Sequence, residues 1–242
     1  MSSTSNSHIG HISQQFNAEL SNLKNHLLVM GGLVEKQVAD AVQALVEGDT
    51  ALAEEVRQNE QDVNQLEMTI DEECTQVLAR RQPAARDLRL VFSVAKIVND
   101  LERIGDEAEK IAKAAIALSE EGRSPRGYVE VRHIGSHVGR MVREALDSFA
   151  RLDIDAALKV MKEDDYVDLE YRSATRSLVM YMMEDPRSIS QVLSVTVVLR
   201  ALERIGDHAS NVAEHVIFMV KGKDVRHRSV ESAEAAIEAQ KR

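Results

Sequence analysis

The sequence predicts an all-α protein, a tandem duplication of two antiparallel three-helix bundles built from six long helices. The hexapeptide Leu101–Asp106 (LERIGD) returns unchanged at Leu202–Asp207, and the apolar positions around both copies correspond, which indicates an internal duplication. The 242 residues include only 3 Pro and 11 Gly, and 3% of them are aromatic, as in proteins with long helices and few turns. Around each hexapeptide, apolar residues alternate in steps of four and three, the heptad spacing of nearly parallel helices in a bundle.

Three helices are expected in the first half. The first carries apolar residues at helical spacing from Phe16 to Leu45 and stops at Gly48. Asp49 and Thr50 supply the N-cap of the second helix, and Pro83 ends it because proline disfavours the helical conformation of the preceding residue. The third helix has the clearest heptad. Its predicted core positions are Leu90, Val94, Ile97, Leu101, Ile104, Ala108, Ile111 and Ala115.

The second half repeats this arrangement. A fourth helix is expected to carry apolar residues from Val131 to Phe149 and to end at Leu152-Asp153. A fifth is expected from about Asp155 to Glu184, and a sixth repeats the heptad and stops near Gly222. Asp185-Pro186 occupies the turn that corresponds to Pro83. We therefore expect a flexible arm at 1–12, one bundle at 13–119, a Gly- and Pro-containing linker at 120–127, a second bundle at 128–222 and a charged tail at 223–242, where 230–240 could form a short helix.

The composition of the chain indicates which partners it binds and in which cellular compartment it acts. A formal charge of −10 argues against nucleic acid or anionic lipid as the primary partner, because both need a clustered basic surface, and makes cations the natural small partners. Cys74 is the single cysteine, which rules out an intramolecular disulfide framework and a thiolate metal site and favours the cytoplasm. No secretory leader and no run of about 18 apolar residues is present, so we expect a protein that is neither secreted nor membrane-inserted.

The glutamate and aspartate of the two LERIGD copies are the residues most suited to binding a ligand. Glu102 and Asp106 are four residues apart, as are Glu203 and Asp207, so each pair stands on one helical face about 6 Å apart. Like charges at this spacing destabilise a helix by about 0.2–0.5 kcal/mol. A bound cation would offset that cost, because two carboxylates one turn apart can bridge a metal through oxygen ligands.

The hairpins bring further acids to the same level. Residues equidistant from Pro83 face each other across an antiparallel pair, which places Glu60 and Asn64 beside Asp106 and Glu102. The corresponding candidates around Asp185-Pro186 are Asp164 and Asp168, beside Asp207 and Glu203. The predicted metal ligands are therefore Glu60, Glu102, Asp106, Asp164, Asp168, Glu203 and Asp207. Oxygen ligands do not separate iron, zinc, magnesium and manganese sharply, so the divalent or multinuclear metal stays unidentified.

Other interpretations of these acids stay open. Leu101 and Ile104 belong to the core, so the acids should point to an outer flank, where they could be solvated or pair with Arg103 and Arg204. A glycine within a helix costs about 1 kcal/mol relative to alanine, so the repeated Gly105 suggests close packing or ligand approach.

Enzymatic chemistry would have to rest on these acids alone. No phosphate-binding loop, nucleophile elbow or Cys/His cluster is present, and the single Glu130-x-x-His133 match lacks the second copy that di-iron bundles need. For His208 and His215 we expect a structural or surface role. One alternative function is a metal-dependent hydrolase or oxidoreductase with a multinuclear carboxylate-bound cluster; another is a structural bundle without metal.

Over practically its whole length the chain resembles the PhoU family of phosphate-signalling regulators. The doubled LERIGD is a fairly specific mark of that family, and other matching segments occur in the family's order. They are Gln15–Leu20, Met30–Gly32, Ala79–Pro83, Asp87–Leu90, Phe149–Asp155 and Met180–Asp185. Asn64 departs from the pattern, because an acid there would complete the first pair on its helix.

The resemblance implies a cytoplasmic protein of two PhoU-like three-helix bundles, often a homodimer, with metal bound by the ERIGD acids. It also implies a non-enzymatic role. PhoU-like proteins are adaptors that connect the phosphate ABC transporter, through its ATPase subunit, to the sensor histidine kinase PhoR. On this basis the expected function is negative regulation of the phosphate-starvation (Pho) response and modulation of phosphate uptake.

Overall fold

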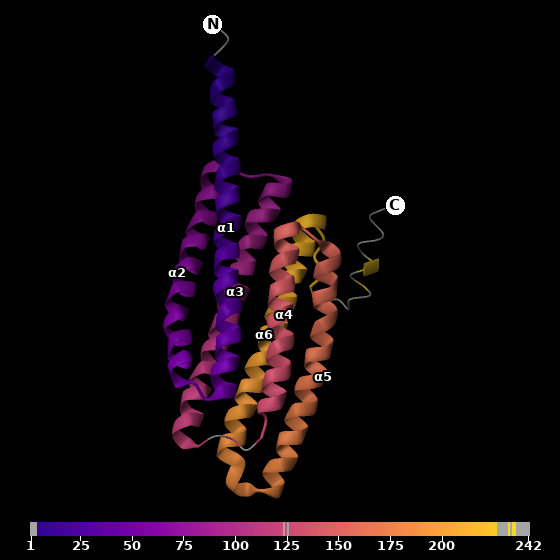
Figure 1. Cartoon of the computed structure of the whole chain (residues 1–242). Coiled ribbons are helices and arrows are strands. Elements are labelled where there is room, and N and C mark those ends of the chain that lie inside the picture. Colours follow the sequence, from indigo (N-terminus) through magenta and orange to yellow (C-terminus); the bar gives the residue numbers. More distant parts are fainter. Residues whose placement is uncertain (1–3, 123, 125, 227–231, 233, 236–242) are drawn as a thin grey trace.

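The computed structural model describes residues 4–122, 124, 126–226, 232 and 234–235, and these residues form an all-helical protein without strands (Figure 1). The predicted fold class is confirmed. The elements are α1 (Thr4–Glu47), α2 (Thr50–Arg81), α3 (Ala85–Glu121), α4 (Tyr128–Arg151), α5 (Ile154–Glu184), a 3-10 turn η1 (Pro186–Ser188) and α6 (Ile189–Lys221).

Most helix ends lie where the sequence predicts them. The Asp49 side chain accepts a hydrogen bond from the Leu52 backbone N–H at 3.0 Å and caps α2, and Gly222 ends α6 with a positive φ of 69°. One end differs, because α1 begins at Thr4, within the segment predicted as an arm. No proline interrupts that segment, so the long helix can continue into it. The predicted helix at 230–240 lies mainly outside the described residues.

The helices form two bundles that stand side by side (Figure 1). Helices α1, α2 and α3 pack together, as do α4, α5 and α6, while α3 packs against α6 and α1 against α4. Leu101 and Ile104 of α3 and their counterparts Leu202 and Ile205 of α6 are fully buried. Burial of these four side chains fixes the rotation of α3 and α6 about their axes.

A buried carboxylate ties the two bundles together. Asp100 of α3 accepts a hydrogen bond from Asn211 at 3.1 Å and lies 3.0 Å from His208 Nδ1 and 3.4 Å from His215 Nε2, all on α6. Burial on its own would raise the pKa of Asp100, but the hydrogen bonds from these three side chains outweigh it and lower the pKa. The two histidines therefore have the structural role expected of them.

Glycines allow α1 and α4 to approach closely. A Cβ on Gly31 of α1 would lie 2.4 Å from Leu146 Cδ2 of α4, and a Cβ on Gly135 of α4 would lie 2.8 Å from Val42 Cγ2 of α1. Val42 is branched at Cβ and has few rotamers, so it cannot move aside easily. No atom of the described residues lies within 4 Å of a Cβ built on Gly139, one turn further along α4.

Gly135→Ala and Gly139→Ala should therefore change stability in opposite directions. Gly139→Ala should raise the free energy of unfolding by about 0.5–1 kcal/mol, because alanine favours a helix and meets no neighbour. Gly135→Ala should lower it by up to about 2 kcal/mol, because overpacking against Val42 outweighs the same gain. Urea-induced unfolding followed by circular dichroism measures both values. An equal rise in the two variants would show that α1 and α4 are not packed this closely.

Candidate metal centres on the two repeats

Helices α5 and α6 bring three predicted ligands together in the second repeat. Asp168, Glu203 and Asp207 each place a carboxylate oxygen within 4.8 Å of the other two. Glu203 and Asp207 stand on successive turns of α6, and Asp168 approaches from α5, as the position of the turn at Asp185-Pro186 predicts. Three carboxylates at this separation can share one divalent cation.

Asp164 is the fourth acid of this cluster. Its Oδ1 would lie 3.3 Å from a Cβ built on Gly206, so the glycine leaves room for the carboxylate beside the α6 backbone. Burial, followed by the charges of Asp207 and Asp168, raises the pKa of Asp164 to about 7. A cation would stabilise the charged form of this partly buried carboxyl beside three other acids.

The cluster contains unsatisfied negative charge. Burial and then Asp207 raise the pKa of Glu203. Partial desolvation by its neighbours and then the charge of Asp168 raise the pKa of Asp207, although its side chain is exposed. Within the described part of the chain, Glu203 Oε2 is buried and has no hydrogen-bond partner. An unpaired buried carboxylate oxygen costs about 1–3 kcal/mol or more, so these donors fit a hard divalent cation.

Arginines provide part of the compensation. Arg200 pairs with Glu203, and Arg172 lies 2.7 Å from Asp168. Arg204, which the sequence suggested as a partner for these acids, pairs with the buried Glu107 of α3 at 3.1 Å. Arginines therefore neutralise Glu203 Oε1 and Asp168, as one of the alternatives from the sequence expects. Asp164 and Asp207 make no ion pair among the described residues.

The first repeat is organised around Glu60 of α2. Gln37 of α1 donates a hydrogen bond from Nε2 to Glu60 Oε2 at 3.1 Å. A Cβ built on Gly105 would lie 2.8 Å from the same oxygen, so Gly105 is needed where Glu60 meets α3. Glu60 Oε1 and Gln37 Oε1 are both buried and have no hydrogen-bond partner in the described structure. Two such acceptors side by side also suit a cation.

Glu102 and Asp106 share an arginine instead of a third acid. Arg103 lies between them, with Nε 3.4 Å from Glu102 Oε2 and a terminal nitrogen 3.7 Å from Asp106 Oδ2. The group of three acids within 4.8 Å that the second repeat shows has no equivalent in the first among the described residues. Asn64 stands where a further acid would complete the set. The second repeat therefore brings more carboxylates together for a metal than the first.

The expectation that the hexapeptide acids point to an outer flank is wrong for Glu203, and Glu60 of α2 is buried as well. Glu60 is only 6% exposed and Glu203 only 7%. Both side chains are covered by the neighbouring helix of the same hairpin. The exposure of an acid therefore depends on this neighbour as well as on how its own helix is rotated relative to the core. Glu102 and Asp106 are partly exposed and Asp207 is exposed, as predicted.

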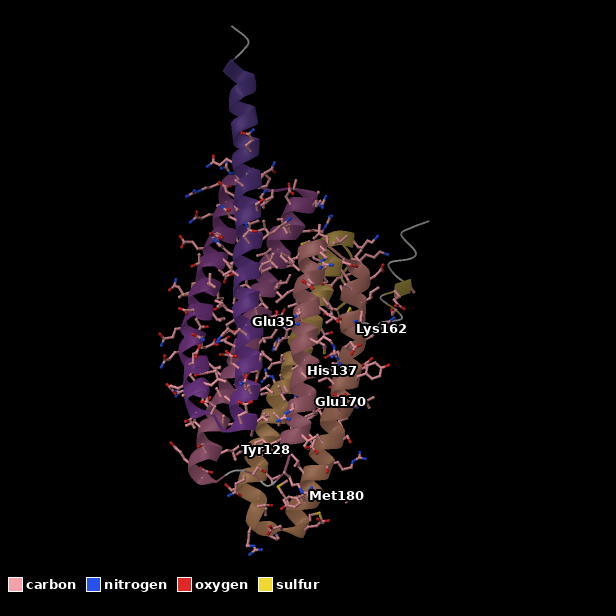
Figure 2. The ribbon with its side chains drawn as sticks, in the orientation of Figure 1. Glu35, Tyr128, His137, Lys162, Glu170 and Met180 are labelled. Atoms are coloured by element: carbon pink, nitrogen blue, oxygen red, sulfur yellow. The ribbon has the colours of Figure 1, made fainter. Side chains whose placement is uncertain are left out.

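The sequence did not predict the polar contacts of Gln37 or of the α4 histidines His133 and His137. Gln37 lies among the core positions of α1, and a polar residue there is the signal that could have identified it. The buried His137 of α4 lies 2.6 Å from Glu163 Oε2 and 3.2 Å from Glu170 Oε2 of α5 (Figure 2). His133 also contacts Glu170, at 3.0 Å, so both histidines join α4 to α5.

Protonation of Glu60 should stabilise the metal-free protein. Burial, and after it the charges of Asp106 and Glu109, raises the pKa of this carboxyl from 4.5 to about 7, although Gln37 opposes the rise. The folded state then binds a proton more tightly than the unfolded state. The contribution of Glu60 to stability is therefore greatest below pH 4.5 and falls by about 3 kcal/mol at most as the pH rises to 7.

Glu60→Gln tests this pH dependence in chelator-treated protein. The variant should be more stable than the original chain at pH 8 and should differ little from it at pH 5, because glutamine resembles the neutral acid. Urea-induced unfolding at both pH values measures the difference, with the exposed Glu121→Gln as the control. A Glu60→Gln variant less stable at pH 8 would contradict the raised pKa.

Comparison with known proteins agrees with this architecture. The PhoU domain model matches residues 27–115 and again 131–216, once in each repeat. The phosphate-specific transport system accessory protein PhoU homolog of Pseudomonas putida is 63% identical over 228 residues, covering 94% of this chain and 89% of that protein. The PhoU accessory protein of Escherichia coli is 44% identical over 217 residues, 90% of each chain.

Solved structures agree as well. The crystal structure of PhoU from Pseudomonas aeruginosa has a TM-score of 0.85 and 63% identity, covering 86% of this chain and all of that one. The phosphate transport system regulatory protein PhoU from Streptococcus pneumoniae has a TM-score of 0.80 at 28% identity, covering 87% of this chain and 99% of the other. With both repeats matched and relatives this similar over nearly their full length, the chain belongs to the PhoU family.

Proposed function

We propose that this protein is an accessory regulator of phosphate transport, a cytoplasmic adaptor that couples the ATPase subunit of the phosphate ABC transporter to the sensor kinase PhoR. In that role it keeps the phosphate-starvation response off when phosphate is plentiful and modulates phosphate uptake. The observation that carries the proposal is the family match in both repeats, together with relatives named as accessory proteins of phosphate transport. Among the described residues no helix is both long and apolar enough to cross a bilayer.

A surface for protein docking lies next to the acids. Ile189, Leu193 and Val197 occupy successive turns of α6 and are 40%, 50% and 58% exposed. A step of seven residues returns nearly to the same face of a helix, so the face of α6 that carries this apolar stripe leads from Leu193 past Arg200 to Asp207. Exposed apolar side chains that lead into a charged cluster are typical of an interaction site.

The corresponding positions of α3 have the same character. Leu88 is 44% and Phe92 50% exposed, and seven-residue steps lead from Phe92 towards Asp106. Both repeats thus present an apolar stripe that ends at an acid cluster. We propose that these stripes dock the partners or a second copy of the chain, and that a metal on the acids neutralises charge at the edge of the interface.

The alternative function, a metal-dependent hydrolase or oxidoreductase, has no support. The PhoU family to which the chain belongs consists of regulatory accessory proteins. The carboxylate oxygens of Asp168, Glu203 and Asp207 lie within 4.8 Å of one another, so a cation held there would supply charge neutralisation at this surface.

Glu203→Ala combined with Asp207→Ala should lower the metal content of the purified protein. The double variant removes two of the three carboxylates within 4.8 Å of one another, while Asp168 remains. Elemental analysis after metal loading and desalting measures the content. Asp62→Ala combined with Glu121→Ala, two exposed acids elsewhere, is the control and should leave it unchanged. Equal metal in both double variants would remove the second-repeat site.

A pull-down tests the adaptor role. The immobilised protein should retain PhoR and the transporter ATPase from cells grown in high phosphate, and retention should change in low phosphate. Leu193→Glu combined with Val197→Glu should weaken retention by placing charge in the apolar stripe, because both side chains are at least 50% exposed and tolerate substitution. Failure to retain either partner in both conditions would contradict the proposal.

A further inference from the structure

The contact between α1 and α4 opens into a groove on the surface formed by these two helices. The groove has a volume of about 770 Å³, within the usual range for a ligand site. On the α4 side, the small residues Gly135, Ser136 and Gly139 line the groove, and a Cβ built on Gly139 would meet no described residue within 4 Å. Glu35 marks the α1 side of the groove in Figure 2.

Three arginines of α4 line this groove in a chain whose formal charge is −10. Arg143 is already paired with an acid, because its Nε donates a hydrogen bond to Glu35 Oε1 at 2.7 Å. Arg132 and Arg140 are exposed, and neither makes an ion pair or hydrogen bond within the part of the chain that the structure describes. Glu47 is the other acid in the lining and also accepts a hydrogen bond from Gln43 at 3.1 Å.

The spacing of the unpaired arginines selects an elongated ligand. Arg132 and Arg140 are eight residues apart on α4, which corresponds to about 12 Å along the helix axis. Both side chains can bend towards the gap, and a ligand of several linked phosphates can contact the two guanidinium groups at once without drawing them together. Ser136 lies between them and offers a hydroxyl donor, and Gln43 offers an amide from α1.

The chemistry of the lining favours phosphate groups. Guanidinium groups bind phosphate oxygens bidentately, and paired phosphates carry more charge per length than carboxylates. No aromatic side chain among the described residues lines the groove, so these residues offer no stacking surface for a base. We propose that this α1–α4 groove binds a linear oligophosphate, either free or as the phosphate end of a nucleotide, between Arg132 and Arg140. The proposal does not depend on the adaptor role or on the metal centres.

Isothermal titration of the full chain with sodium tripolyphosphate in metal-free buffer tests the proposal. Without metal, the acid clusters cannot hold the anion through a cation. Tripolyphosphate should bind more tightly than orthophosphate, which has less charge and fewer oxygens to share between the two arginines, and more tightly than citrate, which lacks phosphate. ATP distinguishes the source: binding equal to that of tripolyphosphate indicates a nucleotide end, and weaker binding indicates a free oligophosphate.

Variants assign the binding to the groove. Arg132→Gln combined with Arg140→Gln should weaken tripolyphosphate binding by about tenfold or more, because each removes charged hydrogen bonds. Gly139→Glu should also weaken it by placing a carboxylate in the groove. Arg176→Gln, an exposed arginine on α5, is the matched control and should leave affinity unchanged. Circular dichroism verifies that every variant remains helical.

Three results would overturn the proposal. They are absence of tripolyphosphate binding, equal affinity in the folded Arg132/Arg140 double variant, and binding of citrate as tight as that of tripolyphosphate.

Discussion

The heptad burial of α3 and α6 is the constraint on which the rest of the structure depends. Leu101, Ile104, Leu202 and Ile205 are fully buried, so neither helix can rotate about its axis without exposing apolar surface. The acids of the same hexapeptides are thereby held against the partner helix of each hairpin. One short sequence thus fixes both the packing and the positions of the carboxylates, and its duplication produces two such arrangements.

The glycine of each hexapeptide shows how the acids are accommodated. Gly105 leaves room for Glu60, and Gly206 leaves room for Asp164, in each case an acid from the preceding helix. Both carboxyls have a pKa raised to about 7. Glycine within a helix and a buried carboxyl each lower stability, and their occurrence together in both repeats favours a ligand that stabilises the acids when bound. The second repeat is better prepared for it, because Asp168 completes a group for which the first repeat has Asn64.

Much of the fold followed from the sequence for physical reasons. Heptad spacing, the Asp49 cap and Pro83 act locally, so helix order and most ends could be predicted. The level at which Glu60 and Asp164 meet α3 and α6 followed from the lengths of the hairpins. The burial of Glu203, the contact of Gln37 with Glu60 and the Arg132–Arg140 groove depend on contacts between different helices. Periodicity within one helix carries no information about them.

The central claim is that the hexapeptide acids of the second repeat bind a cation. Anomalous diffraction from crystals soaked in Mn²⁺ tests it most directly, because it locates the metal itself. The structure predicts an anomalous peak within coordination distance of Asp168, Glu203 and Asp207, whose oxygens already lie within 4.8 Å of one another. Ordered carboxylates with no peak between them at saturating Mn²⁺ would contradict the claim.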